Sequence, residues 1–199
     1  MAVTALAESP LFLSSTPGPY RLADYLALPD QPRCELIYGR FYVTASPTPS
    51  HQLVASLVWQ ALYAIAKKGG GIALAAPLDV VLNDHTVVQP DISYFTAARR
   101  KIIGRRVEGA PDLVVEILSP RTARTDRGEK MKLYFAAGTR EYWLVDLAQR
   151  QIEFLVRRDE EFGVILTVGS VYRSRVLPEI ELDMEALWRE VESQQLGSA

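Results

Sequence analysis

The sequence predicts an α+β fold in which a central mixed β-sheet is flanked by helices. Short apolar segments typical of strands alternate with two stretches that have helical spacing, and turn residues separate them. The 199 residues are 48% hydrophobic, which suits one globular domain with a packed core. We expect a flexible arm over residues 1–19, which hold three prolines, and a single domain over residues 20–199.

The first half of the domain contains a hairpin and a long helix. Residues 20–28 predict a short helix, and residues 34–45 predict a β-hairpin that turns at Tyr38-Gly39. Apolar residues then recur at positions 53, 54, 57, 58, 61, 62 and 65, so we expect a helix with Ser50 as its N-cap. Residues 72–84 and 87–95 each predict one strand, the first bent at Pro77.

The second half begins with residues 96–110, a basic segment that we expect to face solvent, followed by a strand over residues 111–118. A break and a helix come next, with Thr125 as the expected N-cap and Gly138 as the residue after the helix. Residues 140–146, 151–158 and 163–169 predict three strands, and residues 183–190 a closing helix. The aromatic side chains of the first of these strands are better explained by core packing than by a dimer surface.

Charge and composition restrict the partners and the compartment. The net charge of −2 argues against a fully basic surface, although it allows a local basic patch. The single cysteine, Cys34, excludes an internal disulfide and a thiolate metal cage. The N-terminus lacks the basic start of a signal peptide, and no apolar run reaches the roughly 20 residues of a membrane span. We expect a cytoplasmic protein with no membrane partner, and a homodimer because twofold dimers are common.

The segment "PDLVVEILSP" places an acid inside an apolar strand. Glu116 lies among aliphatic residues, and a buried unpaired charge costs several kcal/mol. Buried glutamates are therefore paired or bind metal. The alternative is an edge strand with Glu116 facing water, but Val114 and Leu118 share its face and are apolar.

Two strands begin with Pro-Asp, which by itself can be simple strand punctuation. Asp112 is four residues from Glu116, about 13 Å along a strand, so the two cannot share an ion whose ligands lie about 2 Å away. Asp91 has no such limit if its strand lies beside that of Glu116. Asp91 and Glu116 would then bind Mg²⁺ or Mn²⁺, which can activate water at a phosphodiester.

A lysine often completes such a site by neutralising charge or orienting the attacking water. The residue two beyond Glu116 would point the same way, but it is Leu118. Asp126, Lys130 and Tyr134 lie four residues apart on one helix face, so Lys130 can lean onto the end of the sheet. The alternative is a surface Asp126–Lys130 pair worth a few tenths of a kcal/mol.

These segments resemble the Uma-two family, restriction-endonuclease-like proteins of the PD-(D/E)XK nuclease superfamily. The resemblance covers about residues 20–185 and depends on the joint order of four segments: residues 34–52, 87–95, 110–120 and 126–146. It implies a restriction-endonuclease-like core, in which a divalent metal is held at the mixed sheet.

The resemblance also assigns residues. It places the superfamily's Asp and Glu at Asp91 and Glu116 and its usual Lys at Leu118, and it implies that Lys130 takes the place of that lysine. Glu35 and His51 match further family positions, with Glu35 as a supporting carboxylate. The structural alternatives are an exposed hairpin residue for Glu35 and a helix-start hydrogen bond for His51. For Asp126 we favour a helix cap or pair over a metal ligand.

The sequence therefore predicts a metal-dependent hydrolase, an endonuclease acting on phosphodiester bonds of nucleic acid, with DNA preferred. The expected catalytic residues are Asp91, Glu116, Lys130 and Glu35. One alternative is an inactive nuclease-fold module for binding or assembly, which Leu118 favours, and another is hydrolysis of a small phosphoester. A Lys130 more than about 6 Å from the acidic cleft would favour the inactive module.

Five basic residues are the expected nucleic-acid contacts, and they follow the strand of Asp91: Arg99, Arg100, Lys101, Arg105 and Arg106. This segment connects the two proposed metal strands, so it would flank the site. Side chains of this kind bind phosphate without reading base sequence. A solvated basic loop is the alternative explanation.

Overall fold

The computed structural model describes residues 16–29, 32–167, 169–174 and 176–194. Its largest sheet contains, in spatial order, β11 (Phe162–Ile165), β10 (Gln151–Arg157), β9 (Glu141–Asp146), β8 (Leu113–Ile117), β6 (Ile92–Phe95) and β3 (Ile72–Ala75). Strands β8 and β9 pair in parallel, and the other neighbours pair antiparallel. The predicted α+β class with a central mixed sheet is confirmed.

A second sheet was not predicted. It contains, in spatial order, β2 (Arg40–Val43), β1 (Cys34–Ile37), β5 (Thr86–Val88), β4 (Val80–Asn83) and β7 (Val107–Glu108). A separate pair is formed by β12 (Val171–Arg173) and β13 (Glu181–Asp183). The chain crosses between the two larger sheets several times, and these crossings determine where the acidic residues meet.

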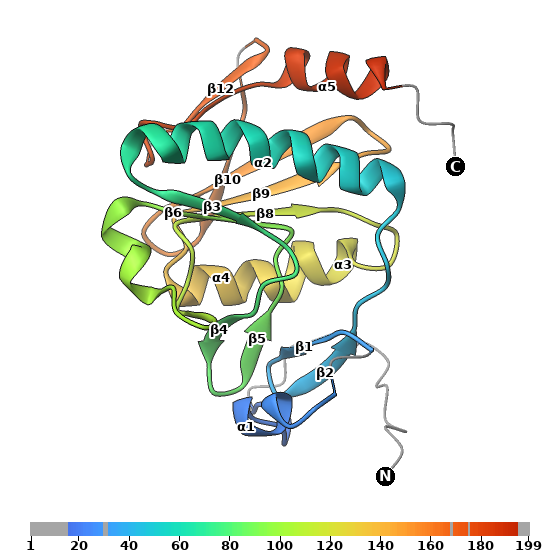
Figure 1. Ribbon diagram of the computed structural model, residues 1–199, viewed down its shortest axis with the longest axis vertical. Coiled ribbons are helices and arrows are strands. Elements are labelled where there is room, and N and C mark those ends of the chain that lie inside the picture. Colours follow the sequence, from blue (N-terminus) through green and yellow to red (C-terminus); the bar gives the residue numbers. More distant parts are fainter. Residues whose placement is uncertain (1–15, 30–31, 168, 175, 195–199) are drawn as a thin grey trace.

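Helices separate and cover the sheets (Figure 1). The long helix α2 (Pro49–Gly69) and the closing helix α5 (Met184–Ser193) lie on one side of the six-stranded sheet, whereas α3 (Ala123–Thr125) and α4 (Met131–Ala137) lie on the other. Two core clusters follow from this arrangement. Val115 packs in the cluster on the α2 side, and Val114 and Leu118 pack with Tyr134 on the α4 side.

The hairpin turn was predicted correctly, whereas the first residue of α2 was not. Tyr38 and Gly39 turn with φ of 49° and 74°, as the hairpin prediction requires. The N-cap of α2 is Thr48, whose Oγ1 accepts a hydrogen bond from His51 N at 3.2 Å, so the prediction of Ser50 is wrong. Pro49 explains the shift, because its fixed φ suits the first helical position.

Two predicted strands are each two strands, so both predictions are wrong. Residues 72–84 split into β3 and β4 at the cis Ala76-Pro77 bond, and residues 87–95 split into β5 and β6 near Pro90. In each case the halves belong to different sheets. Proline lacks the N–H that a continuous ladder needs, so the chain changes sheets there.

The helix after β8 also begins earlier than predicted. Three segments, α3, the π-helical turn η2 (Asp126–Lys130) and α4, follow one another directly, so Thr125 is not an N-cap. Gly138 ends α4 in the left-handed region with φ of 97°, as predicted. Strands β9 to β11, α5 and the short α1 (Leu22–Leu26) are confirmed.

The remaining expectations concern the N-terminus and membranes. Most of the predicted arm, residues 1–15, lies outside the described residues. Within the described part, Gly18 N donates a hydrogen bond to Tyr38 O at 2.9 Å. None of the helices in the described ranges is both long and apolar enough to cross a bilayer.

Candidate active site

Glu116 is buried in an interior strand. Its strand β8 lies between β6 and β9, and the residue is 4% exposed, so the edge-strand alternative is wrong. Its Oε1 lies 3.1 Å from Lys130 Nζ and accepts a hydrogen bond from Tyr134 OH at 3.0 Å. The carboxylate that the sequence places in an apolar strand is therefore paired from the helix layer.

Lys130 is the centre of a buried charge cluster. Besides Glu116, its Nζ lies 3.0 Å from Glu35 Oε1 and 3.5 Å from Asp126 Oδ1. All four side chains are almost fully buried, which rules out a surface Asp126–Lys130 pair and an exposed Glu35. Asp126 pairs within its helix, as favoured.

Asp91 lies opposite Glu116. Strand β6 pairs with β8 in the register Ile92↔Val115, and the next antiparallel position is Asp91 opposite Glu116. The predicted neighbourhood of the two strands is therefore confirmed. Asp91 Oδ2 accepts a hydrogen bond from Ile117 N at 2.8 Å and lies 3.2 Å from His51 Nε2. His51 thus makes a structural backbone bond at the start of α2 and also contacts the acidic centre through its ring.

The protonation of the cluster follows from burial and from its uneven charge. Burial raises the pKa of Glu116 well above its usual value; Lys130 lowers this pKa, and Asp126, Asp91 and Glu35 raise it. Burial lowers the pKa of Lys130, but Glu116, Glu35 and Asp126 raise it by more, so it ends well above its usual value. Lys130 is therefore a cation at neutral pH, and it cannot serve as a general base there.

The neighbours of these two residues also have shifted pKa values. Burial lowers the pKa of His51, but the hydrogen bond and charge of Asp91 raise it more, so its net shift is upward. Burial and the charge of Glu116 raise the pKa of Tyr134 well above its usual value. Tyr134 is thus a neutral hydrogen-bond donor that holds Glu116 in place.

The donor set fits a hard divalent cation. The contacts of Glu116 with Lys130 and Tyr134 use Oε1, and those of Asp91 with His51 and Ile117 use Oδ2, so one oxygen of each carboxylate is outside these contacts. Within the described ranges, no group of three or more His, Cys, Asp or Glu is arranged to hold a metal. Two carboxylates are nevertheless the usual protein share of a Mg²⁺ site, where water and phosphate oxygens complete the coordination.

The second Pro-Asp does not join this centre. Asp112 Oδ2 accepts a hydrogen bond from Thr96 N at 2.8 Å, near the end of β8 away from Glu116. This bond agrees with the prediction of a structural residue at the strand start. Leu118 is buried in the core cluster on the α4 side, so no lysine from β8 reaches the centre.

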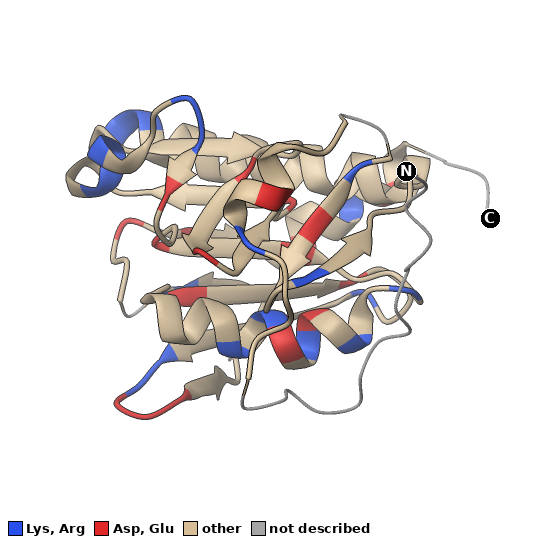
Figure 2. Cartoon of the chain, turned by 90° about the horizontal axis from the view of Figure 1, so that it is seen from below, with Lys and Arg blue, Asp and Glu red and all other residues tan. Residues whose placement is uncertain are grey.

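The five basic residues are not gathered around the acids. Arg99, Arg100 and Lys101 lie in η1 (Ala97–Ile102), which follows the end of β6 away from Asp91 and forms a basic end of the molecule in Figure 2. Arg99 and Arg100 also bind backbone carbonyls. Arg99 donates a hydrogen bond to Ala110 O at 2.5 Å, and Arg100 donates one to Gly70 O at 3.2 Å.

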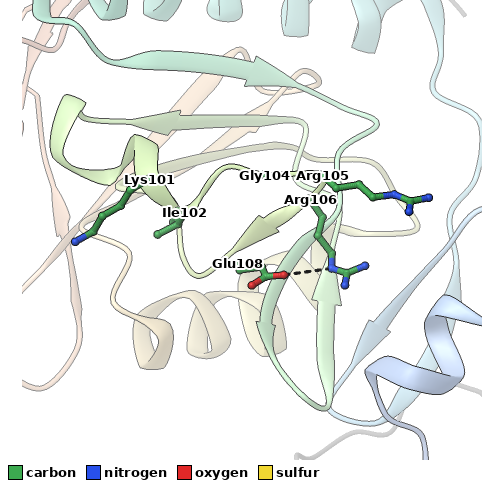
Figure 3. A pocket seen from close by; sticks show the side chains of 6 residues that line it. All are labelled: Lys101, Ile102, Gly104, Arg105, Arg106 and Glu108. Carbon is green, nitrogen blue, oxygen red and sulfur yellow. Dashed lines mark ion pairs between the residues drawn. The ribbon is translucent and has the colours of Figure 1, made fainter.

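The other basic side chains line a cavity of about 570 Å³ with Lys101 (Figure 3). Arg106 lies 3.6 Å from Glu108 there, and Lys101 points away from Arg105. The five basic side chains expected to contact nucleic acid therefore point in different directions, and they do not form one surface beside Glu116.

Three contacts of the centre were missed from the sequence. Tyr134 was placed on the correct helix face without a role, and its spacing of four from Lys130 was the available signal. Tyr142 OH donates a hydrogen bond to Asp126 O at 3.0 Å. The backbone N–H of Gln89 donates a hydrogen bond to Glu35 Oε1 at 2.6 Å. A sequence pattern does not predict which backbone N–H binds a distant side chain.

Comparison with a solved structure identifies the fold. The crystal structure of a protein from Anabaena variabilis, described as a "putative nuclease", matches with a TM-score of 0.73 and 23% sequence identity. The match covers 87% of this chain and 99% of that chain. The chain therefore has the fold of that protein, a mixed sheet with flanking helices.

The family model Uma2, described as "Putative restriction endonuclease", matches residues 22–185. The chain belongs to this family, and the resemblance stated from its motifs is confirmed. Among curated proteins, none matches the sequence.

Proposed function

We propose that this chain is an endonuclease that uses Mg²⁺ or Mn²⁺ to hydrolyse phosphodiester bonds of DNA. The observation that carries the proposal is the position of Lys130, whose Nζ lies 3.1 Å from Glu116 Oε1 although β8 supplies no lysine. This distance is within hydrogen-bond reach, about 2.6–3.2 Å between heavy atoms, which a residue that assists proton transfer requires. Membership of the family supports the nuclease class.

Asp91 and Glu116 are the proposed metal ligands. A bound divalent cation supplies Lewis-acid polarisation of a phosphoryl oxygen. The side chain of Asp91 is 19% exposed and that of Glu116 is 5% exposed, so substrate approaches from the Asp91 side. His51 lies on that side and holds Asp91 in place through Oδ2.

Lys130 supplies positive charge. Because its pKa is raised, it donates a hydrogen bond to the phosphate or to the attacking water and does not remove a proton. Glu35 and Asp126 position its ammonium group, and Tyr134 positions Glu116. These three are positioning residues that act through Lys130 and Glu116.

The test is cleavage of labelled single-stranded DNA, duplex DNA and RNA in Mg²⁺ or Mn²⁺. We expect Asp91→Asn and Glu116→Gln each to lower the cleavage rate by about 10²-fold or more. Asp112→Asn is the matched control, because it alters the same Pro-Asp pattern away from the centre. Undiminished cleavage by both single variants, or an equal loss in Asp112→Asn, would show that Asp91 and Glu116 are not the catalytic carboxylates.

Two other activities are separated by the same experiment. A nuclease-fold binding module would bind DNA but leave it uncut in every metal. A small-phosphoester hydrolase would cleave bis(p-nitrophenyl) phosphate with the same dependence on Asp91 and Glu116 but would leave all three nucleic acids intact.

A further inference from the structure

A second cavity lies on the opposite side of β1 from the acidic centre. It has a volume of about 620 Å³, which is within the range of pockets that bind small organic ligands. Residues from α1, the start of β1, the β5–β6 connection and the segment before β7 line it. We call it the Arg33 pocket, and the residues that matter here are Tyr25, Arg33, Gln89, Arg105 and Arg106.

The Arg33 pocket has a positive lining. Among the described residues, its lining contains three arginines and one carboxylate, that of Asp79. Tyr25 OH donates a hydrogen bond to Asp79 Oδ1 at 2.7 Å, and Gln89 Nε2 donates one to the same oxygen at 2.9 Å. This carboxylate is therefore occupied by neutral donors. The excess of guanidinium groups favours an anion, and guanidinium geometry suits phosphate.

Two polar atoms of the pocket residues have no hydrogen-bond partner among the described residues. They are Gln89 Oε1, an acceptor, and Arg106 Nε, a donor, and both are buried. The orientation of the Gln89 amide is determined by Asp79, which can only accept, so Oε1 must face away from it. Arg106 Nε lies 3.6 Å from Glu108, which lines the other cavity. Both atoms lack accessible surface, so neither contacts a ligand in the pocket, and the inference rests on the positive lining and the ring of Tyr25.

Strand β1 and Gln89 connect the pocket to the acidic centre. Cys34 lines the pocket, whereas the next residue along β1, Glu35, contacts Lys130. Successive side chains of a strand point to opposite faces, so the pocket and the centre lie on opposite sides of β1. Gln89 joins them, because its side chain lines the pocket and its backbone N–H binds Glu35.

We infer that the Arg33 pocket binds one unstacked nucleotide, with its phosphate on the arginines and its base against the ring of Tyr25. The choice of a nucleotide as the ligand rests on the proposed nuclease activity. An aromatic ring beside basic side chains is the combination that binds unstacked bases of single strands. The nucleotide lies away from the scissile bond, because β1 separates the pocket from Lys130.

The test is binding without metal, so that cleavage plays no part. A fluorescein-labelled oligothymidylate of about 12 nucleotides is titrated with the full chain in EDTA and followed by anisotropy. Thymidine monophosphate, used as a competitor, distinguishes a free nucleotide from a nucleotide within a strand. Arg33→Gln is compared with Lys68→Gln, which removes one positive charge from the exposed last turn of α2 and does not line this pocket.

We expect Arg33→Gln to weaken oligothymidylate binding by about tenfold and to lower the slope of log affinity against log salt by about one. Lys68→Gln should change affinity by less than about twofold, because exposed charges are screened. Tyr25→Leu is the second variant, and it should weaken binding about fivefold or more through lost stacking.

Several outcomes would overturn the inference. They are no binding of oligothymidylate to the wild type, equal effects of Arg33→Gln and Lys68→Gln, or unchanged affinity in a folded Tyr25→Leu variant. These results are independent of whether Asp91 and Glu116 support cleavage, since no metal is present. Competition by thymidine monophosphate with an affinity similar to that of the strand would identify free nucleotides as the ligand, and its failure to compete would identify a strand.

Discussion

At the scale of single residues, the decisive feature is one ammonium group among several carboxylates. Lys130 contacts Glu35, Glu116 and Asp126, with Asp91 across the strand pair from Glu116. The sequence was sufficient to identify Glu116 as paired, because an apolar strand cannot bury a lone charge. It was not sufficient to identify Lys130 as buried, because the same spacing also fits a surface pair.

The position of this lysine leads to a rescue prediction. Lys130→Met should lower DNA cleavage by about 10²-fold, since the proposed function assigns its charge to the reacting phosphate. Adding Leu118→Lys to this variant should raise its cleavage rate about tenfold, because residue 118 follows β8 directly and lies on the same face as Glu116. Rates are measured with circular dichroism as the folding control. A folded double variant no more active than Lys130→Met would contradict the assigned role of Lys130.

The raised pKa of Glu116 predicts a pH-dependent stability. Because its folded pKa lies above 4.5, its stabilising contribution is complete below about pH 4.5 and is lost as pH rises through the folded pKa. Glu116→Gln does not titrate, so its free energy of unfolding relative to wild type should increase between pH 4 and pH 8. Urea unfolding in metal-free buffer measures this difference. Parallel pH profiles for the two proteins would contradict the assigned cause.

At the scale of elements, periodicity located the helices but not their first residues. The apolar spacing of α2 was clear, whereas its start depended on whether Thr48 or Ser50 caps it. The two broken strands have a different cause. Residues 72–84 and 87–95 are locally continuous in composition, and only tertiary packing assigns their halves to different sheets. Pro77 and Pro90 were the available signals, and only the first was interpreted as a bend.

The cap of α2 provides a prediction at this scale. Thr48→Ala should lower the free energy of unfolding by about 1 kcal/mol, because it leaves the N–H of His51 without its acceptor. Ser50→Ala is the control and should change it by less than about 0.5 kcal/mol, because Ser50 is in the first helical turn. Both are measured by denaturant unfolding. Equal losses, or a larger loss for Ser50→Ala, would contradict the cap assignment.

At the scale of the whole molecule, the acidic centre lies where three layers meet. Glu35 comes from the five-stranded sheet, Glu116 from the six-stranded sheet and Lys130 from the helical layer between them. Asp91 lies just before β6, in the connection by which the chain passes from one sheet to the other. The motif order predicted the fold and these residues, but the second sheet followed only from the crossings that no local pattern reveals.

Binding of Mn²⁺, followed by the loss of its free-ion electron paramagnetic resonance signal, tests the central claim most directly. The wild type should bind one Mn²⁺ per chain at the Asp91–Glu116 pair, and Asp112→Asn should bind equally well. Asp91→Asn and Glu116→Gln should each weaken binding by about tenfold or more. Equal Mn²⁺ affinity in all four proteins, or none in the wild type, would contradict the proposed metal site.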